Sequence, residues 1–171
     1  GYNYTAYTYD PADSTSISDI FITTIYEDTR GKIWIGTSSN GLNVFDKEDN
    51  TFLRIKHDPG DSTTITSNNI LRAKKVIAED ANGFIWVNTN NGLNKIHPVS
   101  KKVERFYGDL KGQLIYDSLD HALWIADTTL KKFHINTHEL EYFNNSTQNV
   151  KTINAVVAGR DGLIWMGTDK G

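Results

Sequence analysis

The sequence predicts an all-β protein built from consecutive β-propeller blades. A tryptophan-centred repeat is the main observation, because Trp34, Trp86, Trp124 and Trp165 stand 52, 38 and 41 residues apart. Repeat periods of about 40–50 residues indicate propellers or helical arrays. The segments within each period are short, rich in β-branched and aromatic residues, and bounded by Gly, Asn and Asp. That composition favours strands over helices.

Each repeat divides into four predicted strands, which is the number that makes one propeller blade. In the first repeat we predict these strands at Ile20–Glu27, Lys32–Thr37, Leu42–Asp46 and Thr51–Lys56.

Glycines mark the first turn of the repeat. Gly31, Gly83 and Gly162 each precede a tryptophan by three residues. The pair Asn82-Gly83 predicts a two-residue type I′ hairpin, in which both central residues have positive φ. His121 stands at the corresponding position of the third repeat. The turn of that repeat is therefore expected to differ.

The whole chain, residues 1–171, is predicted to be a partial propeller with about three whole four-stranded blades and a partial blade at each end. The segment DPADSTSISDI follows residues 2–9, just as DPGDSTTITSNNI follows the first whole blade. Residues 2–9 are therefore expected to be the outer strand of a preceding blade. The whole blades are predicted at residues 20–56, 70–107 and 112–143, and the inner strands of a further blade at residues 152–171.

The repeated pattern ED-x-x-G-x-[IL]-W-[IVM]-[GN]-T, joined by Asp-Pro…Ser/Thr-Ile-Ser/Thr connectors, resembles the two-component regulator propeller repeat. The resemblance extends over nearly the whole chain and is weakest in the third repeat, where IAD follows Trp124. It implies the periplasmic sensor region of a Bacteroides hybrid two-component system protein, which senses polysaccharide breakdown products. It also implies that any kinase activity lies elsewhere in a longer parent protein.

Composition argues against several functional classes. The net charge of −3 argues against a nucleic-acid surface, which needs a dense positive field. The absence of cysteine excludes zinc fingers, disulfide frameworks and thiol nucleophiles. No stretch approaches the roughly 20 apolar residues of a membrane span, and no cofactor is predicted. The chain begins at Gly1 rather than Met, as expected of a piece of something longer.

No catalytic or metal site is predicted. Acidic pairs such as Glu79 and Asp80 recur from repeat to repeat, and adjacent residues of a strand point to opposite faces. They therefore do not make the facing carboxyls of a glycosidase. His134 and His138 have the spacing of helical metal ligands, but they are predicted to lie on a strand and after a turn, without a third ligand.

The tryptophans are predicted to be structural. Aromatic faces suit sugar ligands, but Trp34, Trp86, Trp124 and Trp165 recur at one register, each after Ile or Leu. That regularity is typical of packing between neighbouring sheets, so all four are predicted to lie in the core.

Ligand-binding residues are predicted at the mouth of the propeller channel, on the turns between second and third strands and on the blade-to-blade connectors. An insertion in the second repeat places Arg72, Lys74 and Lys75 near its inner strand. This basic cluster suits an anionic or uronic ligand, and its alternative is a solvated basic edge. The predicted ligand-binding residues are Ser39, Asn40, Arg72, Lys74, Asn90 and Asn91.

The predicted function is non-catalytic sensing of oligosaccharides by a periplasmic sensor segment. A protein-interaction scaffold is the alternative, and a propeller lyase or glycosidase is the second alternative, because fold alone does not choose among them. Open sheet edges at both ends also predict a homodimer, in which residues 4–9 of one copy complete the last blade of the other.

Overall fold

The structure is a computed structural model and describes residues 4–73, 75–108, 110–143, 152–159 and 161–169. The regular elements among these residues are all β-strands, which pair as antiparallel sheets. The described part of the chain holds no helix able to cross a membrane. The predicted all-β class is confirmed.

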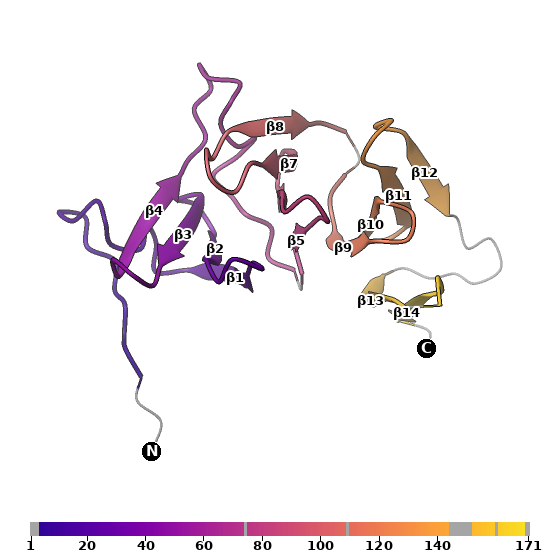
Figure 1. Cartoon of the computed structure of the whole chain (residues 1–171), viewed down its shortest axis with the longest axis horizontal. Helices are drawn as coiled ribbons and strands as arrows, with labels where there is room; N and C mark the ends of the chain where they lie inside the picture. The colour runs from indigo at the N-terminus through magenta and orange to yellow at the C-terminus, as the bar shows by residue number, and fades with distance from the viewer. Residues whose placement is uncertain (1–3, 74, 109, 144–151, 160, 170–171) are drawn as a thin grey trace.

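Three four-stranded sheets and one two-stranded sheet follow one another along the chain, each in meander order (Figure 1). The first blade comprises β1 (Ile22–Glu27), β2 (Ile33–Thr37), β3 (Leu42–Asp46) and β4 (Thr51–Ile55). The second comprises β5 (Ile77–Glu79), β6 (Ile85–Thr89), β7 (Gly92–Ile96) and β8 (Val103–Phe106). The third comprises β9 (Gln113–Asp117), β10 (Ala122–Ala126), β11 (Leu130–His134) and β12 (Leu140–Phe143), and β13 (Ile153–Ala158) pairs with β14 (Ile164–Thr168).

The sheets stand side by side in an arc, as Figure 1 shows. The first strands β1, β5, β9 and β13 contact one another in that order along the inner side of the arc. The last strands β4, β8 and β12 lie on its outer rim. First strands line the channel of a propeller, so residues of successive blades share one concave inner surface.

A tryptophan on the second strand of each whole blade packs against the next blade. Trp34 and Trp86 are fully buried, and Trp124 is 7% exposed. Trp34 shares a core cluster with Ile77 of the second blade, and Trp86 shares one with Leu123 of the third. Trp124 packs with residues of β13. The predicted core position of these three tryptophans agrees with their burial.

A buried aspartate at the end of each first strand holds the indole. The indole Nε1 donates to Oδ2 of Asp28 at 2.9 Å, of Asp80 at 2.9 Å and of Asp117 at 3.0 Å in the three whole blades. The other carboxylate oxygen accepts backbone N–H groups of the following turn. One carboxylate therefore satisfies both the buried indole and the turn, as buried polar groups require.

Trp165 departs from this pattern, and its predicted place in the core is wrong for the described chain. Trp165 is 64% exposed. Among the described residues, no further sheet follows β13–β14 to cover it. In addition, Gly159 stands where the other repeats carry the aspartate that holds the indole.

The first turn of the repeat also differs from the prediction. Asp80 N–H donates to the carbonyl of Phe84 at 3.0 Å, and Gly83 N–H donates to the carbonyl of Asp80 at 2.8 Å. Gly83 has a φ of 77°, whereas Asn82 is not among the residues with positive φ. The turn is thus a longer loop with a glycine bulge rather than a two-residue type I′ turn. The side chain of Asp80 accepts the Asn82 N–H at 2.9 Å and so stabilises this longer loop. The third repeat differs as expected: its aspartate, Asp117, precedes the tryptophan by seven residues rather than six, and His121 itself has a φ of 48°.

Residues 4–9 form no strand, contrary to the prediction for residues 2–9, whose first two lie outside the described residues. A strand needs a hydrogen-bonded neighbour, and no described sheet pairs with this segment. Tyr7 packs on the first blade instead, with its ring centroid 4.9 Å from that of Phe45 and 5.3 Å from that of Phe52. The ring of Tyr7 therefore covers part of the face of the first blade that lies away from the second.

The two long connectors dock on the outer strands of the blade that follows them. An asparagine on the third strand and an arginine opposite it on the fourth make the contacts: Asn43 with Arg54, and Asn94 with Arg105. Each asparagine accepts a connector N–H, at 3.0 and 2.8 Å respectively. Arg54 donates to two connector carbonyls at 3.0 and 2.8 Å, and Arg105 repeats the arrangement. These pairs fix the connectors at the outer rim.

Candidate functional site

The predicted ligand-binding turn of the first blade is bonded to a connector. Ser39 Oγ and Asn40 Nδ2 donate to Oδ2 of Asp19 at 2.9 and 3.2 Å. Burial, the largest influence, acts to raise the pKa of Asp19, but the bonds from Phe21 N–H, Ser39 and Asn40 outweigh it and lower the pKa. Asp19 is therefore a buried carboxylate that holds this turn in place.

The other predicted residues lie at the same end of the blades. Asn90, Asn91 and Arg72 are exposed, and the N–H of Asn90 donates to the carbonyl of Asn69 in the connector at 3.0 Å. Lys74 lies outside the described residues. The adjacent connector residue, 68, bonds the turn of the first blade through its carbonyl. The connector thus joins the two predicted turns, and ligand binding by these residues stays a prediction.

A groove lies toward the opposite end of the inner strands. Two hollows of about 350 and 460 Å³ adjoin, because Tyr26, Glu79 and Tyr116 line both. The first follows β1, β5 and β9, and the second continues over the turns after those strands. We call this surface the channel-side groove and define it by Tyr26, Arg30, Lys75, Glu79 and Tyr116.

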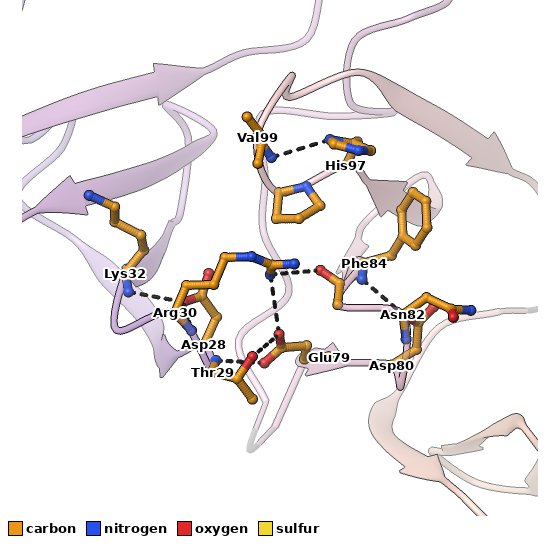
Figure 2. A network of polar contacts seen from close by, with 12 residues as sticks. Asp28, Thr29, Arg30, Lys32, Glu79, Asp80, Asn82, Phe84, His97 and Val99 are labelled. Atoms are coloured by element: carbon orange, nitrogen blue, oxygen red, sulfur yellow. Dashed lines mark hydrogen bonds and ion pairs between the residues drawn. The ribbon is translucent and has the colours of Figure 1, made fainter.

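A buried carboxylate crosses the boundary between the first two blades within the groove. The side chain of Glu79, on β5, is 4% exposed. It accepts the backbone N–H of Thr29 at 2.8 Å and its hydroxyl at 2.6 Å, and it lies 3.4 Å from the guanidinium of Arg30 (Figure 2). Arg30 also donates to the carbonyl of Gly83 at 3.2 Å. These bonds hold the turn after β1 against the second blade.

Two half-buried phenol rings belong to the groove. Burial, followed by the negative charges of Glu79 and Asp28, raises the pKa of Tyr26. Its phenol is therefore neutral and can donate a hydrogen bond. The hydroxyl of Tyr116 lies 2.8 Å from Nδ1 of His121. The groove thus offers aromatic faces and phenol hydroxyls from the first and third blades.

Each hollow of the groove also has a cation in its wall. Lys75 lines the hollow that follows the strands, and Arg30 lines the hollow over the turns. The carboxylates beside them are already engaged, since Glu79 binds the first blade and Asp80 holds an indole. The groove can therefore donate hydrogen bonds to the hydroxyl and carboxylate oxygens of a ligand.

The acidic pairs of the repeat are divided between structural tasks. Glu27 forms an exposed ion pair with a lysine at 2.6 Å, while Asp28 beside it holds an indole. Glu79 binds the first blade, while Asp80 holds the next indole. Within the part of the chain that the structure describes, no three His, Asp or Glu side chains gather to hold a metal ion.

Sequence reasoning missed most residues of the groove. The residue just before the tryptophan-bound aspartate is a glutamate in the first two blades, Glu27 and Glu79, but a tyrosine in the third, Tyr116. At the position before that, the first blade alone among the three whole blades has a tyrosine, Tyr26. This break in the repeat was the available signal. Lys75 was part of the predicted basic cluster, and the structure places it in the groove.

The repeated four-stranded sheets and their shared inner surface define a segment of a β-propeller. The extracellular domain of the hybrid two-component system BT3049 from B. thetaiotaomicron has a similar structure, with a TM-score of 0.77 and 19% identity over 95% of this chain and 23% of that chain. The extracellular domain of BT4673 from the same organism has a TM-score of 0.70 and 20% identity, over 92% of this chain and 22% of that chain. PorZ, a surface component of the type-IX secretion system of Porphyromonas gingivalis, has a TM-score of 0.65 and 21% identity, over 92% of this chain and 25% of that chain. The chain thus spans about a quarter of each of these structures.

A family model described as "Two component regulator propeller" matches residues 16–39. The matched segment contains the end of the first connector, β1 and β2 with Trp34. The resemblance predicted from the sequence is confirmed by this match. No curated protein matches the chain.

Proposed function

We propose that the chain is a ligand-sensing segment of a periplasmic sensor region in a hybrid two-component system, and that it binds its ligand without transforming it. The repeat match and the propeller likeness to two extracellular domains of such systems support this role. The channel-side groove is the observation that carries the binding function. Apolar side chains of the inner strands line much of one hollow, and the adjoining hollow is lined mostly by polar groups that can orient a ligand.

The proposed ligand is an oligosaccharide that carries a carboxylate. The rings of Tyr26 and Tyr116 offer flat faces together with hydroxyl groups, which suits sugar rings. Arg30 bonds Glu79 and Gly83 through Nη1, which leaves its Nε and Nη2 to pair with a carboxylate, and Lys75 adds a compact positive charge. The two hollows, of about 350 and 460 Å³, fall in the range of small-ligand sites, roughly 300–1,000 Å³.

The position of the groove across blade boundaries supplies a route from binding to signal. Tyr26 belongs to the first blade, Glu79 to the second and Tyr116 to the third. A ligand that touches all three is bound best in one relative placement of the blades. Such a ligand shifts the equilibrium between two placements of the blades by the difference between its affinities for them, and by no more.

A protein-interaction role is the second candidate, favoured by one observation. The β13–β14 sheet, with the residue just before β14, exposes Val157, Leu163 and Trp165 by 50%, 56% and 64%. Apolar side chains gathered on one exposed sheet are typical of contact surfaces. For a lyase or glycosidase there is no such support, because the groove carboxylates Glu79 and Asp80 are held by structural partners.

Isothermal titration of the full chain with trigalacturonate and trimannuronate tests the proposed function. We expect at least one to bind, and Tyr116→Ala to weaken binding about tenfold. Tyr4→Ala is the matched control, because Tyr4 is 93% exposed and lies outside the groove. Equal affinity of the Tyr116 and Tyr4 variants would remove the groove as the site. Appearance of cleaved or unsaturated products would contradict the non-catalytic role.

A further inference from the structure

The third blade breaks the repeat at its outer rim. Where the first two blades carry an asparagine–arginine pair that binds a connector, the third has Lys131 opposite Tyr142 at the same register. Lys131 is fully buried and pairs with Asp127 at 3.1 Å, whereas Tyr142 is 52% exposed. The connector before this blade consists only of residues 107–112. It is too short to lie over the outer strands as the long connectors do.

The break coincides with a hollow of about 420 Å³ between the second and third blades. The long connector before the second blade places Ile65 in the core at the preceding boundary and continues over the rim. At this boundary Leu110 from the short connector lies in the corresponding core cluster. No described residue fills the space at the rim, and we call it the rim pocket, lined by Phe106, Tyr107, His138 and Tyr142 among others.

Aromatic rings make most of the wall of the rim pocket. The His138 ring lies 4.9 Å from Phe106 edge-on and stacks on Phe133 at 6.0 Å with an interplanar angle of 8°. Its ring nitrogens form no hydrogen bond with any described residue. Tyr107 and Tyr142 are 64% and 52% exposed. The pocket therefore combines uncovered ring faces with groups that can exchange hydrogen bonds.

The charged groups among the described residues of the rim pocket disfavour an ionic ligand. The described residues that line it include no carboxylate. Arg105 is the cation in the lining, and its guanidinium already donates to connector carbonyls and to the hydroxyl of Thr64. A ligand here is recognised by ring faces and hydroxyl groups rather than by charge.

We propose that the rim pocket binds a pyranose ring of a neutral sugar, at a site separate from the channel-side groove. The C–H face of a pyranose packs on aromatic rings, and its hydroxyls meet the tyrosine hydroxyls and the free nitrogens of His138. The pocket volume of about 420 Å³ suits a small molecule rather than a protein segment, because sites for small molecules measure roughly 300–1,000 Å³. The proposal does not rest on what binds in the groove.

Saturation-transfer NMR and calorimetry of the full chain with cellotriose, mannotriose and xylotriose test this site. We expect at least one to bind, Tyr142→Ala to weaken it about tenfold, and Tyr142→Phe, which keeps the ring, to weaken it less. His138→Asn is the second variant, because His138 has a φ of 60° and asparagine tolerates that backbone. Tyr4→Ala serves as the control and should bind like the wild type, because Tyr4 is exposed and lies outside the pocket.

Three outcomes would overturn the rim-pocket proposal. The first is failure of all three neutral sugars to bind. The second is binding that Tyr142→Ala and His138→Asn leave unchanged. The third is a change in sedimentation of Tyr142→Ala without a change in sugar affinity, which would make the surface a protein contact. Trigalacturonate affinity reports on the groove separately, so loss of one site is distinguishable from loss of the other.

Discussion

Asp80→Asn is expected to destabilise the protein because the side chain of Asp80 accepts three hydrogen bonds. Oδ1 accepts the N–H groups of Asn82 and Phe84 at 2.9 and 3.1 Å, and Oδ2 accepts the Trp86 indole N–H at 2.9 Å. An asparagine has one acceptor oxygen. Its amide would therefore present N–H groups either to the indole or to the turn.

The cost follows from the burial of these groups. Asp80 is 5% exposed and Trp86 is fully buried, so the donor that loses its acceptor has no access to water. Leaving a buried donor unpaired costs about 1–3 kcal/mol, and a hydrogen bond to a charged group contributes about 1.5–3 kcal/mol. We expect a loss of about 2–3 kcal/mol in the free energy of unfolding, which lowers Tm by roughly 4–12 °C for a chain of this size.

Asp161→Asn is the matched control. It makes the same substitution and the same change in charge at the corresponding turn of the fourth repeat, where Asp161 is exposed and accepts one N–H at 3.2 Å. Its effect is expected to stay within about 0.5 kcal/mol. Differential scanning calorimetry of both variants decides the matter. If they melt within about 1 °C of each other, the indole–carboxylate bond does not contribute as argued.

Three further predictions follow from burial, charge and open edges. In dilute solution Trp86→Ala should cost about 3–5 kcal/mol in urea unfolding, whereas Trp165→Ala, at an exposed ring, should cost less than about 0.5 kcal/mol, and equal costs would contradict the packing. Burial acts to raise the pKa of Asp117, but bonds from Trp124 and the turn N–H groups, with the charge of Lys132, outweigh it and hold the pKa below the ordinary 3.8. Such a carboxylate stabilises the fold above pH 3.8 and loses its contribution as the pH falls through the pKa of the folded state. In Asp117→Asn the free energy of unfolding should therefore fall less steeply than in the wild type as the pH drops below 3.8. Equal steepness in the two proteins would refute this. We also predict that this chain dimerises through β14, which among the described residues pairs only with β13, and that Trp165→Ala weakens the dimer. A strictly monomeric species in micromolar sedimentation would exclude this.

The repeat made the blades predictable because packing between sheets imposes the same demand in every unit. A large apolar ring must sit at one register, so Trp34, Trp86 and Trp124 mark the second strand of each blade. Trp165 carries the same sequence mark and is exposed. Its burial depends on a surface that must pack against it, and a local pattern does not show whether that surface is present.

The candidate site was less predictable because its position depends on where the packed blades leave a hollow surface beside the inner strands. Ser39 and Asn40 are polar turn residues, and the sequence did not show that Asp19 from the connector binds them both. Tyr26 and Tyr116 lie close in space only because β1, β5 and β9 stand side by side. Their separation along the chain hides that proximity, and only the break in the repeat hinted at it.

The uneven burial of the tryptophans gives the protein an optical reporter. Trp34, Trp86 and Trp124 are enclosed by apolar neighbours, whereas Trp165 is in contact with water. Solvent relaxation shifts indole emission to longer wavelength, so the red edge of the spectrum comes from a single residue. Any partner or further sheet that covers β13–β14 will remove that edge and shield Trp165 from acrylamide. The rest of the emission will stay unchanged, and binding at this face can be followed without a label.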